Sequence, residues 1–323
     1  MEFGRVKGVD KPISRLVHGT LMLSAEELEK GFELLDAIYG AGCRCWDTAH
    51  VYAGGDSERV LGQWSETRGN RDGIVILTKG CHHTQDRRRV TPFDLTSDLF
   101  DSLARLHTDY IDIYLLHRDD PNVAVAPIVE TLNEHHAAGR IHAIGASNWE
   151  TNRIEEANEY ADKHSMVPFA VSSPNFGLAE QFDEPWRDCI TISGPQKVAD
   201  RAWYAAHKMP LFPWSSMGRG FFSGRISRKN WEMVKGDFPD PVERSYAHEP
   251  NFQRLDRVEE LAAEKGMTVP QVALAWVVQH PDLDIFALIG TFTGAEFNEN
   301  LKALEVKLTA EEMEWLDLRR DDR

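Results

Sequence analysis

Short apolar runs alternate along the chain with longer segments in which apolar residues recur every three or four positions. The short runs predict strands at residues 14–19, 43–49, 73–80, 110–117, 141–148, 168–173, 210–216 and 284–290. The longer segments predict amphipathic helices at 26–41, 94–107, 125–138, 150–163, 195–208 and 252–280, the last broken into two near Gly266 and Pro270. Strands that alternate with helices pair in parallel through right-handed crossovers.

Eight strand–helix units in 323 residues favour an α/β fold of the (β/α)8 or TIM-barrel type. The alternative, a doubly wound open sheet, would carry a glycine-rich phosphate loop after its first strand. The stretch HGTLML at that place lacks the G-x-G-x-x-G spacing. No linker-like or low-complexity stretch divides the chain, so we predict one domain over residues 1–323. Two long loops, 174–194 and 219–250, follow strands and are therefore expected on the catalytic face of the barrel.

Composition and charge exclude several classes of partner. A net charge of −16 disfavours nucleic acid and anionic membrane surfaces, which need clustered Lys and Arg. The four cysteines (Cys43, Cys45, Cys81 and Cys189) lack paired metal-ligand spacing, which indicates reduced thiols. The first residues form no apolar signal segment, and no apolar run approaches the ~20 residues of a membrane span. We therefore expect a cytoplasmic, soluble protein with no membrane partner, and its oligomeric state is not readable from the sequence.

Polar residues with catalytic chemistry lie at or near the ends of the predicted strands. Asp47 follows the second strand, Lys79 the third and His117 the fourth, while Tyr52 lies five residues after Asp47. In a barrel the carboxyl ends of the strands meet at one mouth, so these four side chains are expected to converge there. Each has an ordinary structural alternative: a buried Asp–Lys ion pair, a core histidine and a loop tyrosine.

Five sequence motifs around these residues become informative when they are taken together. The order of these motifs resembles that in the aldo-keto reductases. The motifs are WDTAHVYAGGDSERVLG, ILTKG, DIYLLH, IGASNW and PWSSMGRGFFSGR. The resemblance runs from HGTLMLS near residue 18 to NENLKAL ending at residue 304. It implies a barrel enzyme that uses a nicotinamide cofactor and no metal to interconvert a carbonyl and an alcohol.

The chemistry of carbonyl reduction fits the four residues. The reaction needs a proton donor at the carbonyl oxygen, and a tyrosine with a pKa of about 10 is a reluctant one. A buried ammonium lowers that pKa, and a carboxylate keeps the ammonium charged and oriented. We therefore predict Tyr52 as general acid/base, Lys79 as its electrostatic partner and Asp47 as the residue that holds Lys79. His117 is predicted to bind the carbonyl oxygen or to relay the proton.

The resemblance also implies a set of cofactor contacts. Ser147 and Asn148 correspond to the pair that binds the nicotinamide carboxamide, and Trp214 to the aromatic residue that stacks on the ring. The family usually adds a Gln on the next strand, where this chain has Ser172 and Ser173. Arg219 is the expected counter-charge of the pyrophosphate. The predicted contacts are Thr20, Ser147, Asn148, Ser173, Trp214, Ser215, Met217, Arg219, Gly290, Thr291, Thr293, Glu296 and Asn300.

One departure from the family concerns the choice of cofactor. NADP-dependent members generally place a Lys or Arg after the eighth strand, whereas none occurs here between Gly266 and Leu301. Glu296 stands where the family's arginine is common, and a carboxylate would repel a 2′-phosphate but accept hydrogen bonds from the ribose hydroxyls. We therefore predict that NAD(H) is favoured, with NADP(H) as the alternative. Glu296 could equally be a helix N-terminal acid, and Lys302 or Arg219 could reach the phosphate.

The substrate side is less defined. His50, Trp149 and His82 are predicted to line the pocket, and the segment 82–89 is either a solvated loop or a rim for a polyhydroxy or anionic substrate. A metal at His82, His83 and Asp86 is disfavoured because the ligands are crowded. The expected partner is a small carbonyl or alcohol, such as a sugar or glycoside, with aromatic ketones also compatible. An alternative function is a cofactor-binding regulatory subunit resembling the potassium-channel β subunits, although retention of all four catalytic residues favours the enzyme.

Overall fold

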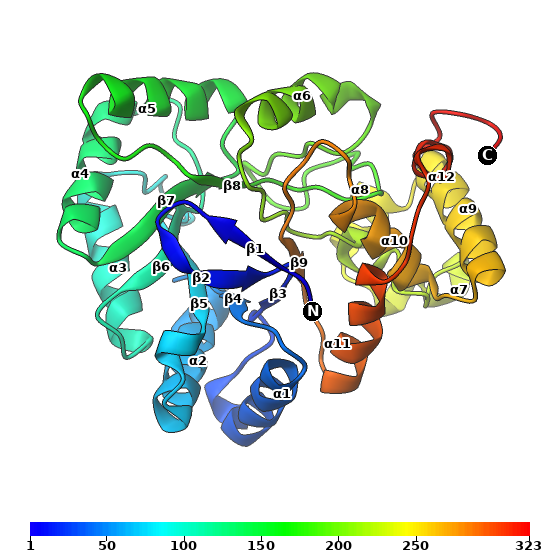
Figure 1. Cartoon of the computed structure of the whole chain (residues 1–323), viewed down its shortest axis with the longest axis horizontal. Coiled ribbons are helices and arrows are strands. Elements are labelled where there is room, and N and C mark those ends of the chain that lie inside the picture. Colours follow the sequence, from blue (N-terminus) through cyan, green and yellow to red (C-terminus); the bar gives the residue numbers. More distant parts are fainter.

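The computed structural model describes all 323 residues. Its centre is a curled parallel sheet of seven strands in the order β8-β7-β6-β5-β4-β3-β9 (Figure 1). Each of these strands lies within one of the predicted apolar runs. They are β3 (Leu16–Gly19), β4 (Cys45–Asp47), β5 (Val75–Gly80), β6 (Ile111–Leu116), β7 (Ile141–Ser147), β8 (Val171–Ser173) and β9 (Ala287–Ile289).

The seventh predicted strand, 210–216, is not a regular strand, but it closes the barrel. Leu211 forms isolated parallel bridges to Ser172 on one side and to Ile285 on the other. Pro210 and Pro213 lack backbone N–H groups, so a continuous ladder cannot form across this segment. The (β/α)8 barrel is confirmed, with this position reduced to bridges.

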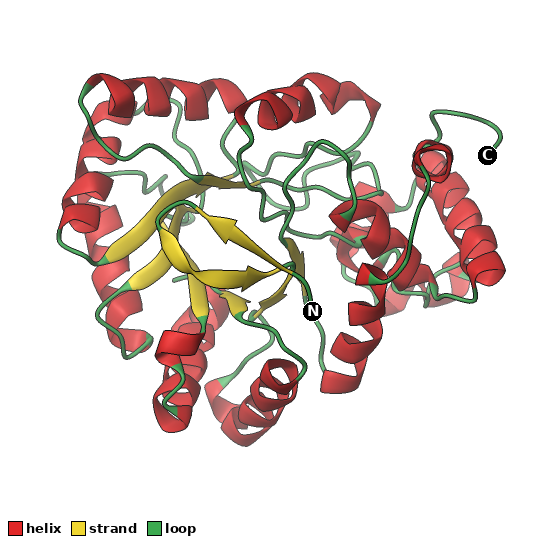
Figure 2. Cartoon of the chain, viewed as in Figure 1, coloured by secondary structure: helices red, strands yellow, loops and turns green.

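Helices surround the strands on all sides (Figure 2). Those that follow the barrel positions are α1 (Leu28–Gly40), α2 (Asp56–Arg68), α3 (Pro92–Arg105), α4 (Val125–Ala137), α5 (Thr151–Lys163), α6 (Val198–His207), α9 (Glu249–Lys265), α10 (Val269–Val278) and α11 (Gly294–Leu301). The predicted break in 252–280 is confirmed, because Gly266 ends α9 in the left-handed region and Pro270 lies in the first turn of α10. The helix α12 (Ala310–Leu316) follows α11.

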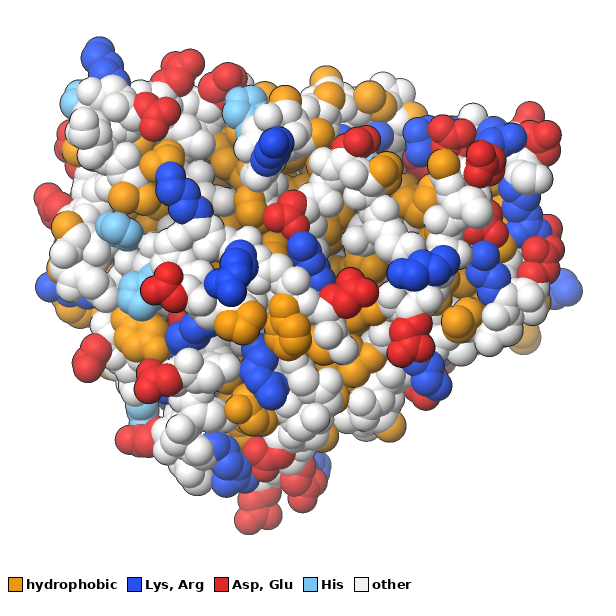
Figure 3. Space-filling view, in the orientation of Figure 1, with side chains coloured by type: hydrophobic (Ala, Val, Ile, Leu, Met, Phe, Trp, Pro, Cys, Tyr) orange, Lys and Arg blue, Asp and Glu red, His pale blue; other side chains and the backbone are white.

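A hairpin of β1 (Phe3–Val6) and β2 (Val9–Ser14), which the apolar pattern did not predict, covers the amino end of the barrel (Figure 1). Val6, Val9 and Ile13 pack into the same apolar cluster as barrel residues such as Val17 and Val75. Acidic and basic side chains are interspersed on this face of the molecule (Figure 3). With this end plugged, the open end is the one at the carboxyl ends of the strands.

Two long segments follow strands at the open end. The segment 174–194 contains no regular helix or strand, as expected. The segment 219–250 is not an irregular loop as predicted, since it contains the short helices α7 (Trp231–Val234) and α8 (Asp240–Tyr246). All four cysteines are buried and unpaired. None of the helices has the length and apolar character that a membrane crossing would require.

Candidate functional site

The ends of β4, β5 and β6 bring together the four residues predicted to be catalytic. Asp47 is the last residue of β4, Lys79 lies in β5, and His117 follows β6 directly. Lys79 Nζ donates to Asp47 Oδ1 at 2.5 Å and to Tyr52 Oη at 3.3 Å. Both members of the Asp47–Lys79 pair are buried, with side-chain exposures of 6% and 2%. The tyrosine hydroxyl, the ammonium and the carboxylate therefore form one chain of polar groups, in which Asp47 and Lys79 are buried and Tyr52 is partly buried.

A tight turn after β4 positions Tyr52. The Tyr52 amide donates to Ala49 O at 3.0 Å, and Ala53, Gly54 and Gly55 then follow with positive φ angles of 47°, 63° and 96°. Glycine adopts this region without steric cost, whereas an alanine there costs about 1–2 kcal/mol. The A-G-G sequence thus reverses the chain immediately after Tyr52 and starts α2 at Asp56.

The electrostatics of the tyrosine differ from the prediction. Burial raises the pKa of Tyr52, and the nearby Lys79 charge lowers it only in part, so the net pKa lies above the usual value. Burial also raises the pKa of Asp47 against the opposing effect of Lys79. For Lys79 burial lowers the pKa, but the charges and hydrogen bonds of Asp47 and Tyr52 together outweigh it and raise the net value. Tyr52 is therefore a protonated phenol beside a charged ammonium.

His117 is a neutral imidazole without a partner in the protein. Burial, followed by the charges of Arg118 and Lys79, holds its pKa well below the usual value. Its ring lies edge-on to Tyr52, with 5.7 Å between ring centroids, and its buried Nδ1 has no hydrogen-bond partner. An unpaired buried imidazole beside a phenol is suited to hydrogen-bonding an external oxygen.

The three predicted pocket residues lie in different environments. The His82 ring packs edge-on against His117, with centroids 4.7 Å apart. His50 turns toward α3, where its Nε2 lies 3.1 Å from Asp101 Oδ2. Trp149 is 1% exposed and its Nε1 donates to Arg118 O at 3.0 Å, so the structure packs it into the core instead of presenting it to an open pocket. Of these three side chains, His82 is the one whose ring packs against the predicted catalytic residue His117.

The residues predicted to bind the nicotinamide carboxamide form a compact network. Asn148 Nδ2 donates to Ser147 Oγ at 3.0 Å, and Asn148 Oδ1 accepts from Trp214 Nε1 at 3.2 Å. Ser147 Oγ in turn donates to Ser173 O at 2.8 Å. The neighbouring Ser172 bonds instead to Tyr204 on α6, so it points away from this network. The structure thus brings together Ser147, Asn148, Ser173 and Trp214. The hydrogen-bonding groups of Asn148 are already bonded to protein partners.

Arg219 has the surroundings expected of an anion-binding residue. It lies in the 3-10 turn Gly218–Gly220, its Nε is buried without a hydrogen-bond partner, and it forms no ion pair. Its guanidinium stacks 4.1 Å from the ring of Trp186, which lies 5.8 Å from Trp214. A partly buried guanidinium without a carboxylate is stabilised by an external anion, so this residue fits the diphosphate of a dinucleotide. Nearby, Ser215 adopts a positive φ of 55° and Met217 packs against the core.

Other predicted cofactor contacts lie around β3, β9 and α11. Thr293 caps α11, and Glu296 Oε2 accepts from the backbone N–H of Phe292 at 2.8 Å. Glu296 is therefore an exposed helix N-terminal acid, which was the structural alternative. Asn300 is buried with no side-chain hydrogen bond, and Thr20 Oγ1 donates to Asp47 O at 3.0 Å. The remaining two predicted contacts, Gly290 and Thr291, follow β9 directly.

Two residues that the sequence reasoning did not single out for these positions lie beside the site. Arg118 is 4% exposed and follows His117 directly. Trp186, in the segment 174–194, lies against both Arg219 and Trp214. A basic residue adjacent to the predicted catalytic histidine was a visible signal for Arg118. Trp186 is one of the aromatic residues that the sequence suggests for a pocket lining, but its place against Arg219 depends on how the segment 174–194 folds back.

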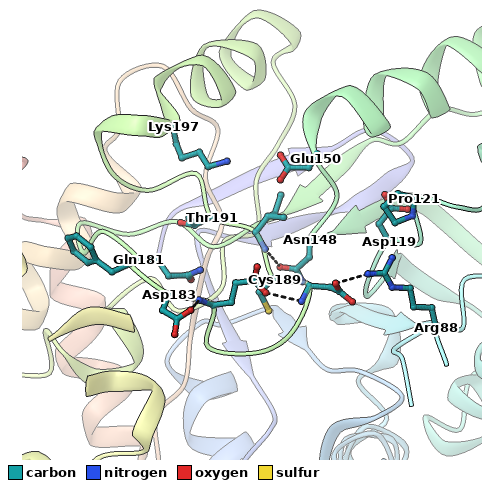
Figure 4. A pocket seen from close by; sticks show the side chains of 14 residues that line it. Arg88, Asp119, Pro121, Asn148, Glu150, Gln181, Asp183, Cys189, Thr191 and Lys197 are labelled. Carbon is teal, nitrogen blue, oxygen red and sulfur yellow. Dashed lines mark hydrogen bonds and ion pairs between the residues drawn. The ribbon is translucent and has the colours of Figure 1, made fainter. Parts of the chain in front are cut away.

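A polar cavity of about 360 Å³ lies beside the segment 174–194 (Figure 4). It contains none of the four catalytic candidates and shares Asn148 with the predicted nicotinamide network. Arg88 reaches from its rim to Asp188 at 2.8 Å, and Asn148 Oδ1 accepts from the Ile190 N–H at 3.2 Å. These contacts fix the covering segment against the barrel.

Comparison with known proteins places this chain among related sequences. The sequence model of the Aldo/keto reductase family matches residues 15–318. The chain is 29% identical over 299 residues to norsolorinic acid reductase of Emericella nidulans, which covers 88% of this chain and 70% of that protein. It is 28% identical over 301 residues to aryl-alcohol dehydrogenase [NADP(+)] of Phanerodontia chrysosporium. This alignment covers 90% of this chain and 75% of that protein. The matched region contains every predicted catalytic and cofactor-binding residue.

Proposed function

Because this chain belongs to the aldo/keto reductase family, whose members interconvert carbonyls and alcohols with a nicotinamide cofactor, we propose that its reaction takes place between Tyr52 and His117. The observation that carries the proposal is the bonding of Lys79 Nζ to both Asp47 and Tyr52 within a buried site. A regulatory subunit would not need this arrangement, and the named relatives are enzymes. Oxidation of NADH or NADPH by purified protein with a panel of carbonyls tests the proposal.

Each of the four residues has its own role in carbonyl reduction. The substrate oxygen lies between Tyr52 Oη and the unpaired imidazole of His117, which donates a hydrogen bond and polarises the carbonyl. Tyr52 transfers its proton to the oxygen, and the Lys79 ammonium stabilises the phenolate that remains. Asp47 keeps Lys79 charged and oriented. The nicotinamide, when bound, supplies the hydride in reduction and accepts it in oxidation.

Cofactor binding is assigned to Arg219, whose Nε has no hydrogen-bond partner in the protein, and to the network of Ser147, Asn148 and Trp214. Arg219 would hold the diphosphate, and Trp214 would hold the nicotinamide together with Ser147 and Asn148. The carboxamide would then exchange with one of the present partners of Asn148, such as the Trp214 Nε1 donor at 3.2 Å. This set of cationic, aromatic and amide groups is suited to a dinucleotide.

For the substrate, we favour aryl aldehydes and the corresponding aryl alcohols, because a relative is named for aryl alcohols. The rings of His82, His117 and Tyr52 pack edge-on as one aromatic cluster, and an aryl group is suited to packing beside such a cluster. The sugar or glycoside substrate stays a prediction. A panel that contains benzaldehydes and aldoses distinguishes the two classes by kcat/KM.

We further propose that NADH is used in preference to NADPH, although one relative is named for NADP(+). The support is that no Lys or Arg occurs between Gly266 and Leu301 and that the carboxylate of Glu296 stands at the start of α11. Glu296→Arg should shift the kcat/KM ratio toward NADPH by about tenfold or more. The control is Asn298→Arg, which introduces the same arginine side chain at another exposed position of α11 and should leave the ratio unchanged.

Measured kcat/KM values for the two cofactors decide this proposal. A preference of the unmodified protein for NADPH of about a hundredfold would contradict it. No shift in Glu296→Arg would place Glu296 outside the adenosine pocket.

The pH dependence follows from the protonation state of Tyr52. Reduction requires the phenol, and burial raises the pKa of Tyr52, so the proton is lost only at high pH. The kcat/KM for reduction should therefore be flat from about pH 6 to 9 and fall above it, whereas oxidation, which requires the phenolate, should rise with pH. His117 contributes no step in this range because its pKa is well below the usual value. A fall in reduction centred near neutral pH would contradict this assignment.

A further inference from the structure

Arg118 is a buried cation without a counter-ion next to the proposed catalytic residues. Its exposed fraction is 4%, and it forms no ion pair with any carboxylate. The other fully buried arginine, Arg254, faces Asp317 at 3.5 Å and Glu180 at 3.7 Å. Burial of a charge without an opposite charge is costly, so an unpaired guanidinium at this depth requires an explanation.

The partners that Arg118 does have are backbone carbonyls. Its Nη1 donates to His117 O at 2.8 Å, and its Nε donates to Arg187 O at 3.2 Å. These bonds fix the plane of the guanidinium between the catalytic strand end and the segment 174–194. They leave Nη2 without a hydrogen bond in the protein, and a neutral donor would satisfy both carbonyls equally well. Holding the segment therefore does not account for the charge.

The charge of Arg118 is directed at the substrate side of the site. Burial is the main cause of the low pKa values of His117, His82 and His83, and the charge of Arg118 lowers them further. The same charge opposes the effect of burial on the pKa of Tyr52. Arg118 follows His117 in the chain and its Nη1 bonds to His117 O, so its guanidinium lies beside the proposed reacting pair. The other unpaired guanidinium at the site, Arg219, is assigned to the cofactor and does not serve this purpose.

We propose that Arg118 binds a carboxylate of the substrate, so that the preferred substrates are carbonyl compounds, or the corresponding alcohols, that carry an anionic group beside an aryl ring. The inference rests on the assignment of Tyr52 and His117 as the reacting pair. A guanidinium is suited to this role because its planar edge presents parallel N–H donors to a carboxylate. The carboxylate supplies the missing counter-ion, and the two backbone bonds hold the guanidinium ready to receive it.

The test compares 4-carboxybenzaldehyde with its neutral isostere, methyl 4-formylbenzoate. The unmodified protein should reduce the carboxylate with a kcat/KM about tenfold or more above that of the ester. Arg118→Met should remove this preference, chiefly by raising KM for the carboxylate about 10- to 100-fold, with little change for the ester. Arg118→Lys keeps the charge and should retain part of the preference. Because the comparison is a ratio within each variant, a partial loss of folded protein does not affect it.

Arg153→Met is the matched control. Arg153 also donates to a backbone carbonyl, Val123 O at 2.9 Å, but it is paired with Asp119 at 3.0 Å. Its replacement should leave the substrate ratio unchanged.

The outcomes separate this inference from the proposed function. Reduction of both aldehydes at equal efficiency, with no change of the ratio in Arg118→Met, would overturn the role of Arg118 and leave the function intact. A raised KM for the nicotinamide cofactor in Arg118→Met, with the substrate ratio preserved, would also overturn it, by assigning the cation to the cofactor. Failure of the unmodified protein to reduce any carbonyl would instead overturn the proposed function itself.

Discussion

Replacement of Tyr52 by Phe is expected to lower the turnover number for carbonyl reduction by about 100- to 10,000-fold, the range attributed to general acid catalysis. The change removes the hydroxyl that Lys79 Nζ reaches at 3.3 Å and leaves the ring in place. The contact of the ring with His117 and the position of Lys79 Nζ 4.8 Å from the ring centroid do not depend on the hydroxyl. Packing and cofactor affinity should therefore change little, and steady-state kinetics together with cofactor titration measure both.

Tyr160→Phe is the matched control for this prediction. Tyr160 lies on α5 and its hydroxyl bonds to Glu130 on the surface, so its loss should leave turnover unchanged. If Tyr52→Phe kept near-normal turnover, the proton would have to come from another group, and the assignment of Tyr52 would be wrong.

Much of the barrel could be predicted because its strands are buried on both faces. A strand of this kind is a continuous apolar run, as in Val75–Gly80 and Ile111–Leu116, where every residue is buried. The pattern failed where this condition was not met. Pro210 and Pro213 break the ladder in the seventh position, and the short β1–β2 hairpin lies across the end of the barrel instead of within it. The helix α2 was missed because polar residues dominate it.

Part of the candidate site could also be predicted from the sequence, and part of it could not. Asp47, Lys79 and His117 could be predicted because the fold itself brings the strand ends together. The placement of Trp186 over Arg219 depends on the path of a 174–194 segment without regular structure, and the burial of Trp149 depends on its contact with Arg118. The direction of the Tyr52 pKa is a balance between burial and the Lys79 charge, and only the folded structure shows that burial is the larger effect.

The second large effect is expected for Lys79→Met, which should reduce activity and stability together. Activity falls because the phenolate of Tyr52 loses the ammonium that stabilises it. Stability falls because Asp47 is left as a buried charge, and the removal of one partner of a buried pair costs about 3–5 kcal/mol of unfolding free energy. Chemical denaturation measures the loss of stability, and kcat measures the loss of activity. The double variant Lys79→Met with Asp47→Asn should recover most of the stability and none of the activity, because it removes the buried charge without restoring the ammonium.

The stability of Lys79→Met should also depend on pH in a defined direction. Burial already raises the pKa of Asp47, and the Lys79 charge is the main opposing influence, so the pKa rises further when Lys79 is removed. A folded-state pKa above that of the unfolded chain means that the folded state holds its proton longer. The variant should therefore lose stability as the pH rises from about 4, the pKa of an unfolded Asp, toward the raised pKa of the buried one, and regain it on acidification. The double variant with Asp47→Asn should lack this dependence. A loss of activity in Lys79→Met with unchanged melting at every pH would show that Asp47 and Lys79 are not buried partners.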